Sequence, residues 1–170
     1  MQHDDSAALV ACLPRLRRYA RALLGARDEA DDLVQDTMAR GWDKLSSWRR
    51  GTDMRAWLFG IMHNLHVDRL RSAPPPAAPI EDALPLAAPA GDAAAGRLAL
   101  RDLDSALRQL PPEQREVLLL VALEELRYEE VAAALDIPLG TVMSRLSRGR
   151  ERLRLLMEGQ PLPSPLKVIK

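Results

Sequence analysis

Apolar residues recur at every third or fourth position along most of the chain, and no segment alternates apolar and polar residues as a half-buried strand does. This period is typical of amphipathic helices packed around a core. The predicted helices cover residues 6–24, 28–45, 54–71, 98–110, 112–123, 128–135 and 139–157, with Thr52 or Asp53 as the cap of the third. We therefore expect an all-α fold.

A stretch rich in proline and alanine divides the chain. Six prolines fall between residues 74 and 89, where large apolar side chains are few. Proline lacks a backbone donor and disfavours a helix at the residue before it, so residues 72–96 are predicted to be a flexible linker. Two small helical domains, 1–71 and 97–158, and a tail, 159–170, complete the predicted organisation.

The last two predicted helices, joined by Asp136-Ile137-Pro138, have the form of a helix-turn-helix. On a helical wheel of the second one, an apolar stripe collects Val142, Leu146, Gly149, Leu153, Leu156 and Met157. The opposite side collects Ser144, Ser147, Arg148 and Glu151, flanked by Met143, Arg145 and Arg154. Because arginine pairs with guanine edges and small residues allow close approach, this side suits the major groove of DNA.

Charge at first argues against a nucleic-acid partner, since 24 Lys and Arg balance 24 Asp and Glu. The charges are nevertheless segregated. Residues 141–154 hold five Arg against one Glu, a net charge of +4, whereas residues 113–136 hold seven acids against two bases, a net charge of −5. An ordinary solvated helix is the alternative, but this segregation favours DNA contact by the last helix.

Two clusters in the first half admit more than one interpretation. Five acids without a base open the second helix: Asp28, Glu29, Asp31, Asp32 and Asp36. They can dock on a basic partner helix, or they can simply stabilise the helix dipole, which the residues alone favour. Next, Trp42, Trp48, Trp57 and Phe59 lie among arginines, a mixture that suits single-stranded nucleic acid. For Trp57 the residues alone favour a place in the core.

Catalytic and metal-binding patterns are not found in the sequence. His63 and His66 lie three residues apart without a third ligand at metal-site spacing, and Cys12 is the one cysteine. The sequence contains neither a phosphate-binding glycine loop nor a nucleophile elbow. It also lacks an apolar run long enough to span a membrane. We expect no catalysis, no cofactor, no metal and no membrane insertion, in a protein of the reducing cytoplasm.

Several motifs resemble bacterial extracytoplasmic-function (ECF) sigma factors of the sigma-70 family. The motifs similar to conserved region 2 are DDLVQDT at 31–37, Gly41-Trp42, MRAWLF at 54–59 and IMHN at 61–64. The motifs similar to region 4 are LPPEQREV at 110–117, YEEVA at 128–132 and GTVMSRLSRGR at 140–150. Residues 51–58 also resemble the general-stress subgroup, which is a weaker signal.

The resemblance implies a promoter-specificity subunit of RNA polymerase and a set of site residues. Asp31, Asp32, Gln35 and Asp36 would dock on the β′ clamp helices, with region 4 near the β flap. The minus-10 strand would be melted and held by Trp48, Arg49, Arg50, Arg55, Trp57, His63, Asn64 and Arg69. The minus-35 duplex would be read by Arg127, Thr141, Met143, Ser144, Arg145, Ser147 and Arg148. The linker would pass near the RNA exit path.

Some residues depart from the family pattern, and other functions stay open. The family often has a basic residue at Met143, Arg at His63, and Gly and Ser at Glu125 and Arg127. The resemblance further implies an anti-sigma factor as partner, action at the nucleoid and a role in stress. The alternatives are a helix-turn-helix regulator that works without polymerase, and an interaction protein that sequesters another factor through its acidic helix.

Overall fold

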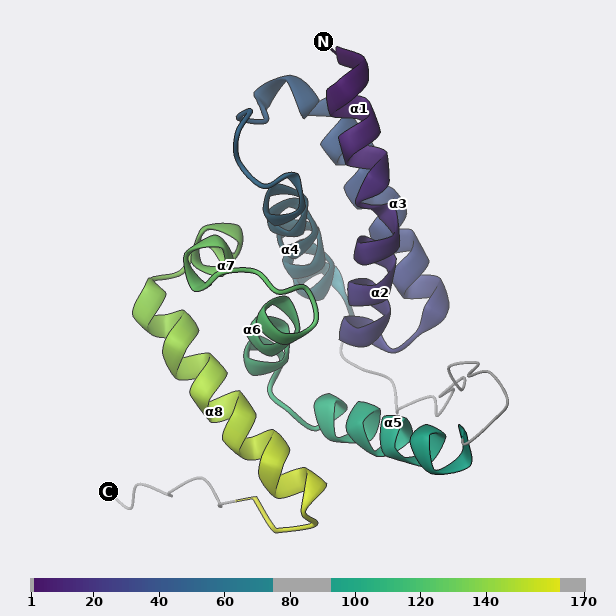
Figure 1. Cartoon of the computed structure of the whole chain (residues 1–170), viewed down its shortest axis with the longest axis vertical. Coiled ribbons are helices and arrows are strands. Elements are labelled where there is room, and N and C mark those ends of the chain that lie inside the picture. Colours follow the sequence, from purple (N-terminus) through teal and green to yellow (C-terminus); the bar gives the residue numbers. More distant parts are fainter. Residues whose placement is uncertain (1, 75–92, 163–170) are drawn as a thin grey trace.

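The computed structural model describes residues 2–74 and 93–162, and within them it contains eight α-helices, one 3-10 turn and no strand. This confirms the all-α prediction. The helices are α1 (Gln2–Ala11), α2 (Leu13–Leu24), α3 (Arg27–Asp43), α4 (Met54–Ser72), α5 (Ala93–Arg108), α6 (Pro112–Ala122), α7 (Tyr128–Leu135) and α8 (Leu139–Met157) (Figure 1). Most of the predicted linker and most of the tail lie outside the described residues.

The first predicted helix, residues 6–24, is in fact two helices. It breaks at Cys12, between the end of α1 at Ala11 and the start of α2 at Leu13. Pro14 explains the break, because its ring nitrogen cannot donate to the preceding turn but fits the first turn of a new helix. The Cys12 thiol donates to Ala8 O and is buried at the junction.

The third predicted helix is capped by Asp53 rather than Thr52. The Asp53 carboxylate accepts a hydrogen bond of 2.8 Å from the backbone N–H of Arg55 and ion-pairs with its guanidinium at 2.7 Å. Burial on its own would raise the pKa of Asp53, but the side-chain and backbone hydrogen bonds from Arg55 outweigh burial and lower it. The 3-10 turn Leu45–Ser47 and a short loop precede this cap.

In the second half, α7 and α8 begin and end as predicted. The turn between them is made by Asp136, whose left-handed backbone (φ 53°) stops α7. By contrast, α5 starts at Ala93, earlier than the predicted residue 98, because alanines there extend the helix.

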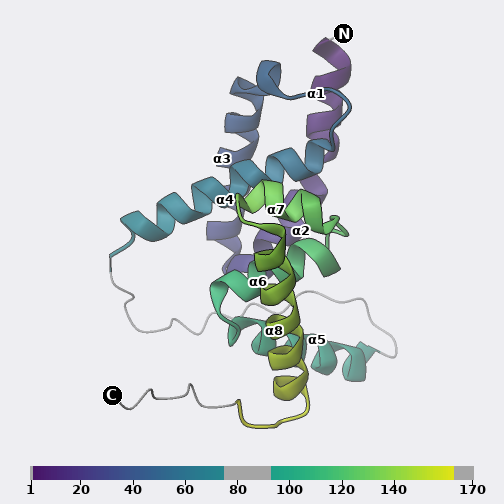
Figure 2. The same cartoon turned by 90° about the vertical axis from the view of Figure 1, so that its left-hand side faces the viewer.

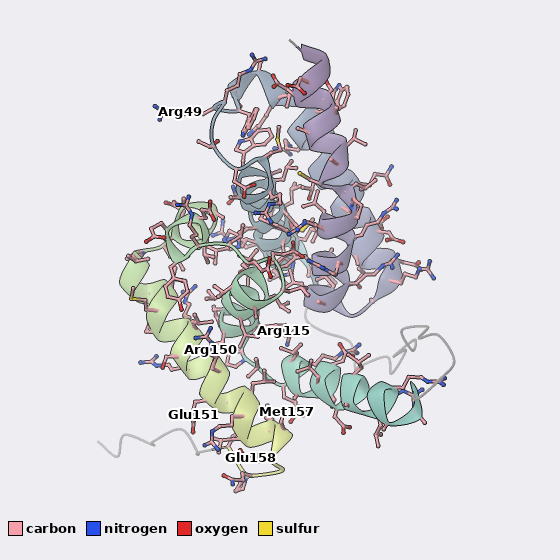
Figure 3. All side chains as sticks on the ribbon, in the orientation of Figure 1. Arg49, Arg115, Arg150, Glu151, Met157 and Glu158 are labelled. Carbon is pink, nitrogen blue, oxygen red and sulfur yellow. The ribbon has the colours of Figure 1, made fainter. Side chains whose placement is uncertain are left out.

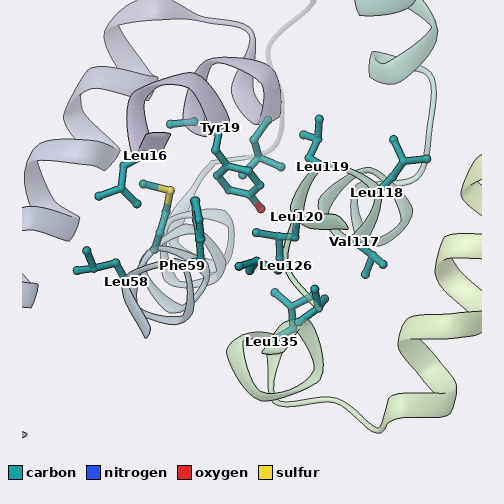
Figure 4. Packing of buried hydrophobic residues seen from close by; sticks show 14 of the residues in the cluster. Leu16, Tyr19, Leu58, Phe59, Val117, Leu118, Leu119, Leu120, Leu126 and Leu135 are labelled. Carbon is teal, nitrogen blue, oxygen red and sulfur yellow. The ribbon is translucent and has the colours of Figure 1, made fainter. Parts of the chain in front are cut away.

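The two halves pack against each other. Helices α2 and α4 contact α6 and α7 respectively, and Figure 2 shows α7 lying against α4. One hydrophobic cluster runs through both halves. At its centre Tyr19 and Phe59 meet edge to face, with ring centroids 4.9 Å apart, beside Leu120 and Leu126 (Figure 4). Burial raises the pKa of Tyr19 well above its ordinary value.

We predict that Asp53→Ala lowers the free energy of unfolding by about 1 kcal/mol at neutral pH, because a helix loses its cap. Thr52→Ala removes only an exposed hydrogen bond to Arg49 O and should change the free energy of unfolding by less than about 0.5 kcal/mol. Since the pKa of Asp53 is lowered in the folded state, its stabilisation is present above the unfolded pKa and is lost as pH falls through the folded one.

Urea unfolding followed by circular dichroism, at neutral and at strongly acidic pH, measures both effects. Equal losses for Asp53→Ala and Thr52→Ala at neutral pH would contradict the assignment of the cap.

Candidate nucleic-acid interface

Helix α8 presents its predicted apolar stripe to the rest of the second half. Val142, Leu146 and Gly149 are buried, and Gly149 lets α8 approach α6, since a Cβ there would lie 3.4 Å from Gln114 Cβ. Met157 was expected in the stripe, but it is 46% exposed. It is the last residue of α8, where no further turn flanks its side chain.

The opposite side of α8 faces solvent. Met143, Ser144, Ser147 and Arg148 are exposed, whereas Thr141 and Arg145 are half-buried. An open groove of about 580 Å³ between Tyr128 and α8 borders this side and shares Met143 and Ser147 with it. Four of the six residues predicted to contact the minus-35 duplex from α8 thus lie on its exposed side.

The arginines of α8 differ in how they are held. Arg154 ion-pairs with Glu151 at 2.7 Å and with Glu158 at 2.8 Å, and these hydrogen bonds raise its pKa. Figure 3 shows Glu151 and Glu158 along the last part of α8. Within the described part of the chain, Arg145 and Arg148 form no salt bridge, so their charge is not neutralised by a neighbouring acid.

Arg127 lies at the N-terminus of α7, next to Tyr128. Its side chain is 77% exposed and ion-pairs with Glu130, whose other oxygen accepts the Arg127 backbone N–H at 2.8 Å. The hydrogen bond from the Arg127 side chain lowers the pKa of Glu130. Arg127 therefore caps α7 through Glu130 and keeps its guanidinium at the surface.

The acidic face predicted for polymerase docking is continuous on α3. Asp31, Asp32, Gln35 and Asp36 are all exposed, while Leu33, Val34 and Thr37 on the other side are buried. Asp31 lies 3.6 Å from Arg21, and Asp36 ion-pairs with Arg69 at 2.5 Å. The ion pair between Asp36 and Arg69 thus joins a residue predicted to dock on polymerase to one predicted to bind the minus-10 strand.

The mixed aromatic and basic cluster is split between core and surface. Trp48 and Trp57 are half-buried against the hydrophobic cluster, in keeping with the core role that the residues alone favoured for Trp57. Arg49, labelled in Figure 3, and Asn64 are exposed. Arg50 ion-pairs with Asp5 at 2.6 Å, a contact that the sequence did not indicate.

Two residues predicted to bind the minus-10 strand, His63 and Arg55, contact the second half in this structure. His63 Nδ1 lies 2.6 Å from Glu116 Oε1, and Arg55 Nη1 donates to the carbonyl oxygen of Glu124 at 3.3 Å. Sequence reasoning missed both glutamates. The available signal was their position among leucines and valine in and just after α6, where a solvated acid is unusual.

The neighbouring His66 is half-buried, and burial lowers its pKa. Within residues 2–74 and 93–162, no group of three or more potential metal ligands comes together. No helix in these same ranges is long and apolar enough to cross a membrane.

The second half contains a helix-turn-helix whose second helix is basic, an arrangement typical of DNA-binding transcription proteins. Comparison with known proteins identifies the family. Residues 9–63 match the model of the Sigma2 domain of PhyR, and residues 100–153 match sigma-70 region 4. The ECF RNA polymerase sigma factor EcfG of Rhodopseudomonas palustris is 36% identical over 154 residues, which cover 88% of this chain and 82% of EcfG.

Two similar solved structures support the same family. The sigma factor RpoE of Bartonella quintana, in complex with the anti-sigma factor NepR, is 32% identical with a TM-score of 0.74, over 91% of this chain and 97% of RpoE. CnrH, in complex with the cytosolic domain of CnrY, is 27% identical with a TM-score of 0.69, over 95% and 92% of the two chains. The chain therefore belongs to the ECF RNA polymerase sigma factors.

Proposed function

We propose that this protein is a dissociable sigma subunit that directs core RNA polymerase to promoters carrying minus-35 and minus-10 elements. It catalyses nothing itself, because the polymerase supplies the chemistry. The observation that carries this proposal is the exposed face of α8, with its uncompensated arginines, in a chain that also matches region 2. This function requires action in the bacterial cytoplasm, at the nucleoid.

Region 4, proposed as residues 97–158, would read the minus-35 element as duplex. Arg145 and Arg148 are proposed to reach guanine edges or phosphates, because neither is held by a salt bridge within the described residues, whereas Arg154 is engaged by two glutamates. Ser144 and Ser147 leave room for close approach of the helix. Met143 offers a thymine methyl an apolar contact, Thr141 lies at the start of the helix, and Arg127 is placed for a phosphate.

Region 2, proposed as residues 1–71, would melt and hold the minus-10 strand. The loop that carries Trp48, Arg49 and Arg50 precedes the capped start of α4, a rigid support for a flipped base. Extruding a base costs a few kcal/mol, which a preformed pocket with aromatic and basic groups can offset. On α4, Arg55, Trp57, His63, Asn64 and Arg69 would follow the strand. The linker, proposed as residues 72–96, would connect the two regions.

Polymerase docking is proposed for the acidic face of α3. Asp32 and Gln35 are exposed, and Asp31 and Asp36 have only surface partners within the same half. Surface ion pairs of this kind contribute little, so a basic partner helix can replace them at small cost. The β′ clamp helices are the proposed partner, with the β flap holding region 4.

Control by an anti-sigma factor is part of the proposal. RpoE and CnrH, the similar structures, are each complexed with a second protein, NepR and the cytosolic domain of CnrY. The resemblance of residues 51–58 to the general-stress subgroup supports a role in stress. We therefore propose that a NepR-like protein holds this sigma factor inactive until stress releases it.

We predict that Arg148→Ala weakens discrimination between a cognate and a mutated minus-35 element by about 1–3 kcal/mol, because a bidentate contact to a base is lost. Arg154→Ala is the matched control, since Glu151 and Glu158 already hold that side chain. Fluorescence anisotropy of the reconstituted holoenzyme on both promoters measures the difference. Uniform weakening on both promoters would mean that Arg148 contacts phosphate alone.

We also predict that Asp32→Ala combined with Asp36→Ala weakens binding to core polymerase roughly tenfold or more, because a charged docking face is removed. Asp68→Ala combined with Asp102→Ala removes the same charge from exposed positions on α4 and α5, outside this face, and should have little effect. Titration of labelled sigma factor with core polymerase measures both. Unchanged binding of the first variant would make the docking assignment wrong.

The sigma function itself is tested by transcription from a promoter library with purified core polymerase. Initiation that depends on this protein supports the proposal. DNA binding without any initiation would favour the helix-turn-helix regulator instead.

A further inference from the structure

The loop of residues 48–53 carries two neighbouring arginines that are held in different ways. Arg49 is exposed, forms no salt bridge within the described part of the chain, and points away from α1 (Figure 3). Arg50 donates from Nε at 3.1 Å and from Nη2 at 2.6 Å to the same oxygen, Oδ2 of Asp5. A guanidinium held through two of its nitrogens keeps a fixed position and orientation, whereas an unheld one moves with its long side chain.

Asp5 reaches the loop because of the way α1 packs. Asp5 and Leu9 are four residues apart and so lie on the same side of α1. Leu9 is buried next to Gly41 of α3, where a Cβ would lie 3.5 Å from Leu9 Cδ1. One turn earlier, Asp5 therefore faces the segment between α3 and α4, and Figure 1 shows this end of α1 beside that segment. The Asp5 side chain is only 19% exposed.

The loop places Arg50 in a tight turn. The backbone N–H and the hydroxyl of Thr52 both donate to Arg49 O, at 3.1 Å and 2.6 Å. Between them, Gly51 has the positive φ (89°) that the third position of a type II turn requires. Asp53 then caps α4. Arg50 thus lies in a turn that is closed by Thr52, and 47% of its side chain is exposed, so a ligand can reach it.

We propose that Asp5 is a positioning residue for minus-10 recognition, because its ion pair holds Arg50 as a fixed side of the loop that takes the flipped base. This inference rests on the proposed function of region 2. A held guanidinium offers an unstacked base a flat surface for stacking, and Asp5 compensates its charge. Arg49, which has no such ion pair, would bind the phosphate backbone.

This division of roles predicts a combined effect of Asp5→Asn that a loosened fold would not produce. Without the carboxylate, Arg50 moves and its charge becomes available to phosphates. Selectivity for the flipped base should therefore fall, while the salt dependence of strand binding should increase. A variant that merely destabilised α1 would weaken binding to every sequence alike.

The first test is transcription by the reconstituted holoenzyme from a promoter library randomised over the minus-10 element, with the transcripts sequenced. At one position of the element, that of the flipped base, Asp5→Asn should lower the ratio of the preferred base to the others about fivefold or more. Asp4→Asn is the matched control, because it makes the same change at the exposed neighbour in the first turn of α1. Equal ratios for Asp5→Asn and Asp4→Asn would overturn the proposal.

A double-mutant cycle decides whether Asp5 acts through Arg50. Arg50→Gln should lower the same ratio by a similar factor, and adding Asp5→Asn to Arg50→Gln should have no further effect. Factors that simply multiply would mean that Asp5 acts independently of Arg50, which would overturn its positioning role.

The ion pair itself can be measured without DNA or polymerase. In nuclear magnetic resonance spectra of the full chain, the Arg50 Nε–H should exchange slowly with water in the wild type and in Asp4→Asn, and fast in Asp5→Asn. Fast exchange in the wild type would show that Asp5 does not hold Arg50 in solution, and the proposal would be wrong.

Salt dependence separates the two arginines. The holoenzyme is titrated at several salt concentrations with a single-stranded oligonucleotide that carries the minus-10 sequence selected from the library. Arg49→Gln should reduce the slope of log K against log salt by about 0.7, the value for one phosphate contact, and Arg50→Gln should leave it nearly unchanged. Asp5→Asn should increase the slope by up to about 0.7. Equal reductions for the two arginine variants would mean that Arg50 binds phosphate, against the proposal.

The same experiments distinguish this proposal from the proposed function. If the holoenzyme initiates from no promoter of the library, the sigma function and the role of Asp5 are both wrong. If it initiates with a clear minus-10 preference that Asp5→Asn leaves intact, the sigma function stands and only the role of Asp5 is wrong.

Discussion

The carboxylate of Glu124 lies entirely out of water, where an unpaired charge would cost several kcal/mol. Within the described residues its salt bridges come from Arg15 and Arg18 of α2, so they hold the turn after α6 against α2. That position brings α7 onto α4 at Gly60 and closes the hydrophobic cluster over Phe59. The relative arrangement of the two halves thus combines this buried ion pair with the hydrophobic cluster that spans both.

The same arrangement decides which surfaces stay available. The acidic face of α3 and the basic face of α8 lie outside the contact between the halves, so both stay exposed for the proposed docking on polymerase and reading of duplex DNA. The α4 surface is different, since Arg55 and His63 are turned into the contact. The balanced net charge is the sum of these opposite surfaces, and Glu124 of the second half pairs with Arg15 and Arg18 of the first.

Local structure was readable from local signals. Helices α7 and α8 were predicted to the residue, because Asp136-Ile137-Pro138 stops one helix and allows the next to begin. The sequence left the cap of α4 open between Thr52 and Asp53, and the break at Pro14 was overlooked because leucines continue the helical period across it. Such errors arise where one backbone donor or acceptor outweighs the hydrophobic pattern.

The sequence by itself determined the helices, the apolar stripe of α8, the acidic face of α3 and the sigma-factor motifs, because each is a property of a few neighbouring residues. Only the tertiary structure decided that Glu124 is buried and that His63 faces Glu116. In the sequence these are charged residues like any other on a helical surface. Glu116 lies 53 residues from His63 in sequence, and Glu124 lies 106 and 109 residues from Arg18 and Arg15. Only the folded chain brings these carboxylates and bases together, across the contact between the halves.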